Sequence, residues 1–278
     1  MTKPRGPTVM GVLNVTPDSF SDGGLYLDVE AAVAHAGAMA DEGAAIVDVG
    51  GESTRPGAEP VPEAEEIERV VPVVERIAAG DAGVRVSIDT RKLAVAEAAV
   101  GAGARIVNDV SAFRAAPEMA GLVATSGADC CLMHMLGDDP RTMQADPRYD
   151  DVVSEVRAFL EERLAFATAE GVPEERVWLD PGIGFGKTLD HNLELLRRLD
   201  EIVAIGRPVV IGASRKSFLG KVTGRPEQER VAATVATSVI ALERGASIFR
   251  VHDVPETVDA LKVAGATFGA RWTTSPSA

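Results

Sequence analysis

The chain alternates between two hydrophobic patterns. Eight short runs are almost continuously apolar and rich in valine and isoleucine, and polar residues or glycines close them. Continuous apolar runs of this length are typical of strands buried on both faces, as in a parallel sheet. We therefore predict strands over residues 9–15, 45–50, 84–89, 105–110, 130–135, 176–180, 208–214 and 247–253.

The stretches between these runs carry apolar residues at helical spacing. The clearest are residues 28–42, 62–79, 91–102, 150–170, 190–204 and 228–244. A Gly-Ala pair precedes four of the predicted strands, with its glycine at 43, 103, 127 or 245. Because glycine tolerates the left-handed conformation that ends many helices, each pair is predicted to end a helix and lead into a strand.

Eightfold alternation of strand and helix over this length predicts an α/β fold of the (β/α)8 TIM-barrel type. An open, doubly wound parallel sheet is the structural alternative, because periodicity alone does not show closure. No linker-like change of composition divides the chain, so residues 1–278 are predicted to form a single domain, with loose ends at about 1–6 and 273–278.

Composition narrows the classes of function. With 46% hydrophobic and 25% charged residues, the chain has the composition of a soluble globular protein. Its net charge of −14 argues against nucleic-acid or anionic-membrane partners but leaves room for a local anion site. No apolar run reaches membrane-spanning length, and no signal-peptide pattern opens the chain. Cys130 and Cys131 are adjacent in an apolar run, which argues against a disulfide or a zinc site and favours the cytoplasm.

The ends of the predicted strands carry the polar residues most suited to chemistry. They are Asn14, Asp48 with Glu52, Asp89, Asn108 with Asp109, His134, Asp180, Ser214 with Arg215 and Lys216, and Arg250 with His252. Helix N-caps would explain the Asp, Asn and Ser residues but not the Lys, Arg and His residues. Because the carboxyl ends of barrel strands meet at one mouth, a shared ligand site there is the better interpretation.

The residue types indicate a ligand with two different ends. Acceptors on Asp89, Asn108 and Asp180 suit a planar heterocycle with an amino group beside a ring N–H. Cationic or donor groups suited to phosphate are Arg55, Arg250 and His252, and Arg215 and Lys216 are also expected to face a ligand oxygen. The polar, glycine-containing segments 14–24 and 50–60 are predicted to close over the substrate.

The segment LDPGIGFGKT (179–188) offers a competing hypothesis, because its end resembles a nucleotide-binding P-loop. The first glycine of that motif would fall at Pro181, which has no N–H to offer a phosphate. The match is therefore weak, and Lys187 and Thr188 are predicted to begin the next helix or to face solvent.

Taken together, eight motifs resemble dihydropteroate synthase, the folate-pathway enzyme that sulfonamides inhibit. The resemblance covers nearly the whole chain. The motifs are GVLNVTPDSFSDGG (11–24), DVGGESTRPGA (48–58), SIDT (87–90), NDVS (108–111), LMHM (132–135), LDPGIGFGKT (179–188), GASRKSFLG (212–220) and RVHDV (250–254).

The resemblance implies a TIM barrel, commonly a homodimer, that joins 6-hydroxymethyl-7,8-dihydropterin diphosphate to 4-aminobenzoate with Mg²⁺ and releases diphosphate. It implies a pterin site of Asp89, Asn108, Met133, Asp180, Phe185, Gly212 and Lys216. The diphosphate would meet Asn14, Thr54, Arg55, Arg250 and His252, with Asn14 also on the Mg²⁺. The aminobenzoate would meet Phe20, Thr54, Pro56 and Ser217, and the expected catalytic groups are Asp180, Lys216, Arg55 and Asp89.

The implied chemistry is an SN1-like substitution, because the pterin ring can donate electrons to the carbon that loses diphosphate. A pterin-binding methyltransferase would share Asp89, Asn108 and Asp180 but would not need segments 14–24 and 53–57. A non-catalytic pterin-binding paralogue would not need its phosphate-binding cations. The chain departs from the family pattern at Ala112-Phe113 and along 134–144, two loops that could alter the pterin-side entrance.

Overall fold

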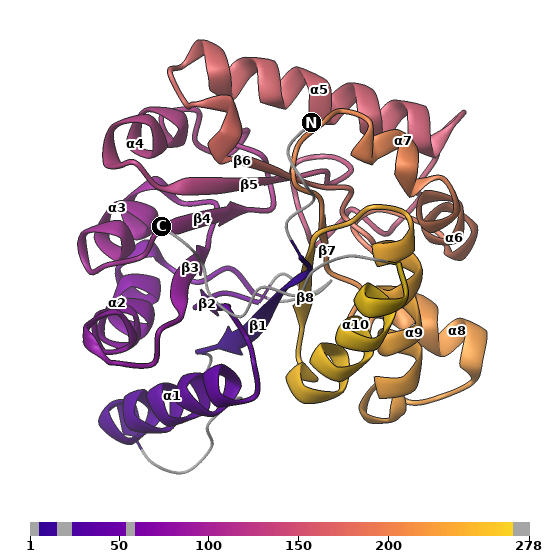
Figure 1. The fold of residues 1–278 in the computed structure, drawn as a ribbon. Helices are drawn as coiled ribbons and strands as arrows, with labels where there is room; N and C mark the ends of the chain where they lie inside the picture. The colour runs from indigo at the N-terminus through magenta and orange to yellow at the C-terminus, as the bar shows by residue number, and fades with distance from the viewer. Residues whose placement is uncertain (1–5, 16–23, 54–58, 269–278) are drawn as a thin grey trace.

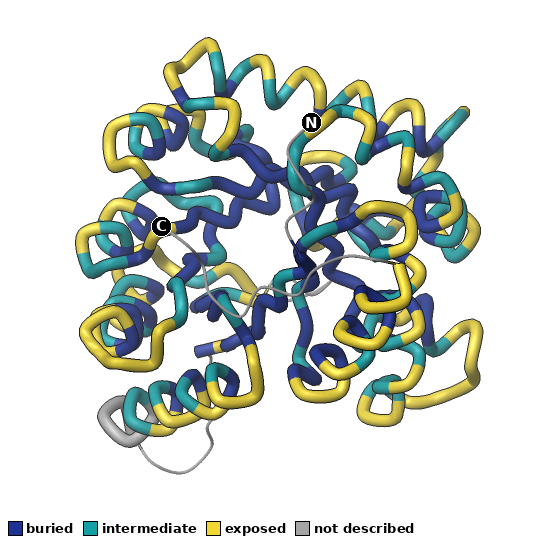
Figure 2. The backbone as a smooth tube through the Cα atoms, viewed as in Figure 1, coloured by how far each residue is buried: buried dark blue, intermediate teal, exposed yellow. Residues whose placement is uncertain are grey.

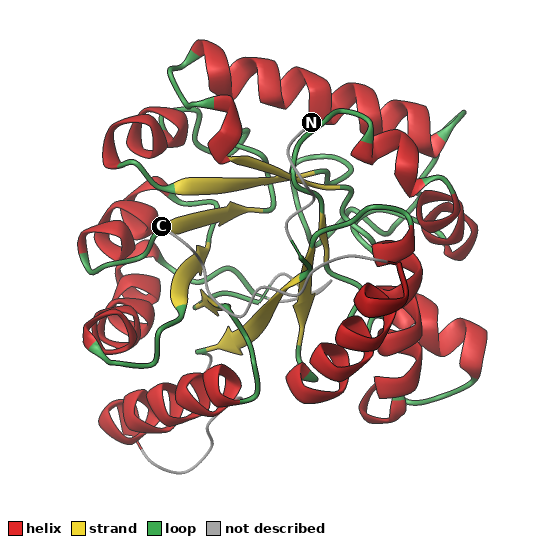
Figure 3. Cartoon of the chain, viewed as in Figure 1, coloured by secondary structure: helices red, strands yellow, loops and turns green. Residues whose placement is uncertain are grey.

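The computed structural model describes residues 6–15, 24–53 and 59–268, and its strands form a barrel surrounded by helices (Figures 1 and 3). All the pairings between neighbouring strands are parallel. The strands are Thr8–Asn14 (β1), Ile46–Gly50 (β2), Arg85–Asp89 (β3), Ile106–Asp109 (β4), Asp129–Met133 (β5), Val177–Asp180 (β6), Val210–Ile211 (β7) and Ile248–Val251 (β8).

Closure of the barrel depends on its shortest strand. The ladder runs in the order β6-β5-β4-β3-β2-β1-β8-β7, which leaves β6 and β7 at its two ends. A parallel bridge between Leu179 and Val209 joins these ends, and the N–H of Leu179 donates to the carbonyl oxygen of Pro208 at 2.9 Å. The structure therefore confirms the predicted TIM barrel and excludes the open sheet.

Helices follow the strands and form the outer ring (Figure 1). None in the described part of the chain is long and apolar enough to cross a membrane. The helices are Gly24–Asp41 (α1), Glu63–Ala79 (α2), Leu93–Gly101 (α3), Met119–Ser126 (α4), Val152–Ala169 (α5), Leu189–Arg197 (α6), Leu199–Val203 (α7), Ser217–Thr223 (α8), Val231–Glu243 (α9) and Val254–Phe268 (α10).

All four glycines predicted to end a helix have positive φ. The angles are 103° at Gly43, 118° at Gly103, 76° at Gly127 and 99° at Gly245. At Gly103 a side chain would also collide with Ala78, so both conformation and space require glycine there. The pattern gave no clear signal for α4, α8 and α10, although each lies between two predicted strands or follows the last one.

The barrel strands are buried on both faces, as their apolar runs predict (Figure 2). Their outward side chains pack under the helices in the main core. A smaller apolar cluster belongs to the strands alone, and it fills the barrel interior with Met10, Ile46, Ile106, Cys131, Trp178, Val210 and Ile248. Because side chains alternate along a strand, residues two positions beyond these also point inward, toward the mouth at the carboxyl ends of the strands.

Candidate active site

That alternation places most of the predicted site residues at the mouth. Asp48, Asn108, Met133, Asp180, Gly212 and Arg250 each lie two residues beyond a member of the interior cluster. Asp89 is the last residue of β3 and pairs in register with Asn108. The mouth of the barrel is therefore polar directly above an apolar interior.

Arg250 ties three strands together at this mouth. Its Nε donates to Oδ2 of Asp48 at 2.6 Å, and its Nη2 donates to Oδ2 of Asp89 at 2.6 Å. The same oxygen of Asp48 accepts from Nδ2 of Asn108 at 3.0 Å. The two carboxylates raise the pKa of the guanidinium although burial opposes them, so Arg250 holds acids as well as being a candidate phosphate ligand.

The sequence placed Asp48 among the residues of the mouth but assigned it no particular contact with a ligand. Asp48 is fully buried, and its Oδ1 has no hydrogen-bond partner among the described residues. The available signal was its position, because a carboxylate in the middle of the apolar run IVDVG requires a cation nearby. In the structure it orients both Asn108 and Arg250.

Asp89 has an unusual affinity for protons. Burial raises its pKa to about 7, against the attraction of Arg250 and with added repulsion from Asp48. A carboxyl group that changes charge near neutral pH is typical of a functional site.

Asp180 and Lys216 face each other across the mouth near Phe185. Oδ1 of Asp180 accepts from the N–H of Gly182 at 2.7 Å, and burial raises the pKa of this carboxyl group. Burial lowers the pKa of Lys216 to about 8, although Asp180 attracts the proton. The ammonium donates to the carbonyl oxygen of Ile183 and lies 4.5 Å from the centre of the Phe185 ring.

Apolar side chains line one side of this polar mouth. Met133 and half-buried Phe185 belong to a small cluster with Val110, Met135 and Met143. Gly212 lies beside the two cations of the mouth, where a Cβ would stand 3.8 Å from Nζ of Lys216 and 3.9 Å from Arg250. Apolar walls beside carboxylate and ammonium groups suit a flat ring with polar edges.

The remaining described candidates lie at the rim. Asn14 is exposed at the end of β1, and a Cβ on Gly50 would lie 3.9 Å from its Oδ1 and 3.5 Å from Cβ of Asp89. The backbone N–H of His252 donates to Oγ of Ser214 at 3.1 Å, and Nδ1 of the His252 ring lies 3.0 Å from the same oxygen. Ser217 is the exposed first residue of α8. Phe20, Thr54, Arg55 and Pro56 lie outside the described residues.

Arg215 does not face the mouth as expected. Its guanidinium pairs with buried Asp253, with Nε 3.0 Å from Oδ2. The backbone N–H of Arg215 donates to Oγ1 of Thr234 at 3.0 Å. The left-handed backbone at Arg215, with φ of 57°, turns neighbouring side chains to different sides. Of the two adjacent cations, only Lys216 belongs to the mouth.

The prediction that Lys187 faces solvent is wrong. Its side chain is buried, and Nζ lies 2.8 Å from Nδ1 of His134 and 3.1 Å from the carbonyl oxygen of Phe185. Burial lowers the pKa of Lys187 well below its usual range, and burial beside Lys187 lowers that of His134 to about 2. Thr188 does begin helix α6, as its N-cap. A lysine packed inside the fold cannot serve a P-loop, so the nucleotide hypothesis fails.

Replacing Lys187 with methionine should change how stability depends on pH. The folded protein binds the Lys187 proton more weakly than the unfolded chain does, so this lysine makes the wild type more stable as pH rises. We expect the melting temperature of the wild type, measured relative to Lys187→Met, to increase between about pH 7 and about pH 9. Parallel profiles for the two proteins would contradict a lowered pKa of the buried lysine.

Glycines in segment 179–188 allow a left-handed backbone and close packing of the loop. Gly182 has φ of 67°, and a Cβ there would overlap the carbonyl oxygen of His134. At Gly186, with φ of 66°, it would overlap Cβ of Leu136. The close packing of this loop against residues 134–136 holds Asp180 and Phe185 at the mouth.

The departure at Ala112-Phe113 lies in the core rather than at the entrance. Both residues are buried under the outer helices, with φ of 53° and 64°. The Asp109 carboxylate stabilises this turn by accepting from the N–H groups of Ser111 at 2.7 Å and Phe113 at 2.9 Å. Asp109 is therefore a structural acid, in contrast to Asn108 beside it.

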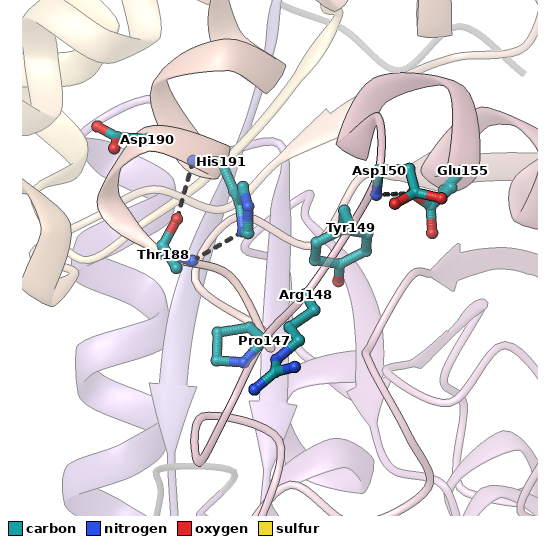
Figure 4. A pocket seen from close by; sticks show the side chains of 8 residues that line it. All are labelled: Pro147, Arg148, Tyr149, Asp150, Glu155, Thr188, Asp190 and His191. Carbon is teal, nitrogen blue, oxygen red and sulfur yellow. Dashed lines mark hydrogen bonds between the residues drawn. The ribbon is translucent and has the colours of Figure 1, made fainter.

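A hollow of about 670 Å³ lies beside the mouth, between segment 147–155 and the start of α6 (Figure 4). Tyr149 and His191 meet edge to face within it, with ring centres 5.0 Å apart. Nδ1 of His191 already accepts from the N–H of Thr188 at 3.2 Å. Three carboxylates, those of Asp150, Glu155 and Asp190, and one guanidinium, that of Arg148, line the hollow.

No group of three or more His, Cys, Asp or Glu side chains within the described ranges could hold a metal ion. A magnesium ion carried by a diphosphate does not need one, because substrate oxygens and water supply most of its ligands. The amide oxygen of Asn14, which is exposed at the rim, is a neutral oxygen of the kind that Mg²⁺ accepts as a protein ligand.

Fold and site together define a parallel β/α barrel protein with a polar mouth at the carboxyl ends of its strands. The family model for pterin binding enzymes matches residues 10–252. A dihydropteroate synthase of Escherichia coli is 48% identical over 265 residues, which cover 95% of this chain and 93% of that protein.

Solved structures of Xanthomonas albilineans dihydropteroate synthase are similar over nearly the whole length. The complex with 4-aminobenzoic acid has a TM-score of 0.89 and 49% identity, covering 96% of this chain and 94% of that chain. The complex with 7,8-dihydropteroate has a TM-score of 0.85 and 46% identity, covering 96% and 95%. This chain belongs to the dihydropteroate synthase family of pterin-binding enzymes.

Proposed function

We propose that this chain joins 6-hydroxymethyl-7,8-dihydropterin diphosphate to 4-aminobenzoate, giving 7,8-dihydropteroate and diphosphate. The observation that carries the proposal is the mouth itself, where Asp89, Asn108 and Asp180 offer acceptors beside the cations Lys216 and Arg250. Relatives of the same family bind 4-aminobenzoic acid and 7,8-dihydropteroate.

The pterin would lie against Phe185 and Met133, with its amino and ring N–H groups toward Asp180 and Asp89 and its ring oxygen toward Lys216. The carboxylates would stabilise positive charge as the ring donates electrons to the methylene carbon. The C–O bond breaks with its electron pair leaving on diphosphate. The arylamine nitrogen then forms the new C–N bond and loses a proton to solvent.

Negative charge builds up on the leaving diphosphate, so fixed positive charge is the main catalytic requirement. Arg55, Arg250 and His252 are the proposed phosphate ligands, with Thr54 beside them. Phe20, Thr54, Pro56 and Ser217 are proposed to hold the aminobenzoate. When bound, Mg²⁺ would supply further positive charge at the diphosphate, with Asn14 as its protein ligand.

Asn14→Ala should therefore weaken the use of metal. Chelation should abolish turnover, and the variant should need about tenfold more Mg²⁺ than the wild type for half-maximal rate because it lacks one oxygen ligand. Titrating Mg²⁺ at saturating substrates measures this. Equal requirements in the two proteins would remove Asn14 from the metal site.

Pterin binding should depend on the charge of Asp89. Its pKa lies near 7, and only the carboxylate form accepts two N–H donors. We expect the affinity for 6-hydroxymethylpterin, measured by calorimetry, to fall by up to about tenfold for each pH unit below about 7. The Asp89→Asn variant should bind weakly with a flatter profile, and a wild-type profile as flat as the variant's would contradict the assignment.

We also propose a homodimer in the cytoplasm. Three consecutive helices expose large apolar side chains, with exposed fractions of 58% at Val222 in α8, 46% at Ile240 in α9 and 70% at Val263 in α10. Burial against a second copy would remove this surface from water. Sedimentation should give twice the chain mass of 29.1 kDa, and a monomer at micromolar concentration would contradict the dimer.

A further inference from the structure

The segment after β2 has both of its described ends fixed by one side chain, that of Lys92 at the start of α3. Glu52 precedes the undescribed residues 54–58, and Val61 follows them. Nζ of Lys92 donates to Oε2 of Glu52 at 2.6 Å and to the carbonyl oxygen of Val61 at 2.6 Å. The same carboxylate oxygen accepts from the N–H of Val61 at 2.8 Å, which closes a ring of three hydrogen bonds.

This ring is anchored to the fold from below. The third donor of Lys92 meets Oε2 of Glu66 at 2.5 Å, and Glu66 lies fully buried in α2. Arg69, one turn further along the same helix, donates from Nη1 to the carbonyl oxygen of Gly51 at 2.8 Å. Helices α2 and α3, which lie side by side (Figure 1), thus hold the segment where it leaves the barrel.

The hydrogen bonds of Lys92 indicate that it positions other residues and does not bind substrate itself. An ammonium has three N–H donors, and Glu52, Val61 and Glu66 use all of them. The side chain is only 16% exposed, against 22% for Arg250 in the site. Burial would lower the pKa of Lys92, but the hydrogen bonds to Glu52 and Glu66 outweigh it and keep the ammonium charged.

We propose that Lys92 is a positioning residue, which fixes the ends of segment 52–61 so that its residues meet diphosphate and aminobenzoate. The proposal rests on the function inferred above, which assigns Thr54, Arg55 and Pro56 to those ligands. Because Glu52 and Val61 are held before any ligand binds, ordering these two residues adds no entropic cost to binding. The three donors of Lys92 reach Glu52, Val61 and Glu66 and none of the proposed pterin ligands, so the affinity for pterin should change much less than that for aminobenzoate.

Lys92→Met keeps most of the apolar stem and removes the three donors. Hydrogen exchange should become at least about tenfold faster in peptides spanning residues 52–61, where the N–H of Val61 loses its fixed acceptor. The kcat/KM for 4-aminobenzoate should fall at least about tenfold, while the dissociation constant of 6-hydroxymethylpterin, which lacks the diphosphate, stays within about twofold. Lys92→Arg, which keeps charge and donors, should recover part of the loss.

Two further variants separate positioning from general stability. Lys92→Met combined with Glu66→Gln avoids an unpaired buried carboxylate and should behave as Lys92→Met does. Arg85→Met breaks a pair with Asp129, of side-chain exposures 33% and 21%, at the other end of the barrel and should change neither readout. The proposal would be overturned if hydrogen exchange in segment 52–61 were unchanged, or if Lys92→Met weakened pterin binding as much as it lowered kcat/KM for 4-aminobenzoate. Failure of both Lys92 variants to fold would also overturn it. If the wild type makes no product, the proposed function fails, and exchange still tests the role of Lys92.

Discussion

Arg250→Met is expected to lower the free energy of unfolding by about 3–5 kcal/mol, the largest effect on stability of any substitution considered for the mouth. The guanidinium pairs with Asp48, which is fully buried, and with Asp89. Without it, two carboxylates remain close together in a poorly solvated place, where each penalises the charge of the other. Urea denaturation of purified wild type and variant at neutral pH measures the difference.

Two companions show whether the lost charge is the cause. Asp48→Asn in the Arg250→Met background should recover part of the stability, because it removes one of the stranded acids. Arg85→Met breaks the more exposed pair with Asp129 and should cost only about 1 kcal/mol. A similar, small cost for both arginines would mean that Arg250 does not hold the acids of the mouth together.

Asp180→Asn is expected to reduce pterin affinity by about 100-fold or more, or about 2.7 kcal/mol. The amide can still accept from the N–H of Gly182, so the loop should keep its shape. Toward the ligand, however, the asparagine presents an N–H donor where the aspartate presents an acceptor. This donor would face the N–H donors of the pterin, and the hydrogen bonds would be lost. Calorimetry with 6-hydroxymethylpterin measures the loss, and kcat/KM should fall at least as far.

Asp109→Asn is the matched control, because Asp109 is another buried acid at the end of a strand. It accepts from Ser111 and Phe113 on the outer side of the barrel, so its replacement should cost stability and spare pterin affinity. If both variants bound pterin equally well, Asp180 would lose its place as the main recognition group.

The fold could be predicted because its signals are local. A strand buried on both faces has to be apolar throughout, and a helix that turns into a strand needs glycine at its end. Runs such as 45–50 and glycines such as Gly43 carry these signals. Closure could not be predicted from the pattern, because it depends on a single bridge between Leu179 and Val209.

The site was predictable to the extent that strand ends gather at one mouth. Asp89, Asn108, Asp180 and Lys216 were found in this way. Pairing inside the site was not predictable, since a sequence does not say which acid meets which cation. Only the structure shows that Arg250 pairs with two acids. It also shows that Arg215 pairs with Asp253 and that Lys187 contacts His134.

A reaction with defined substrates tests most directly whether this protein makes dihydropteroate. Purified protein should be incubated with Mg²⁺, 6-hydroxymethyl-7,8-dihydropterin diphosphate and 4-aminobenzoate, and both products quantified by mass spectrometry and a diphosphate assay. We expect equal amounts of 7,8-dihydropteroate and diphosphate, with neither formed when either substrate is omitted. A folded protein that bound pterin but formed no dihydropteroate would contradict it.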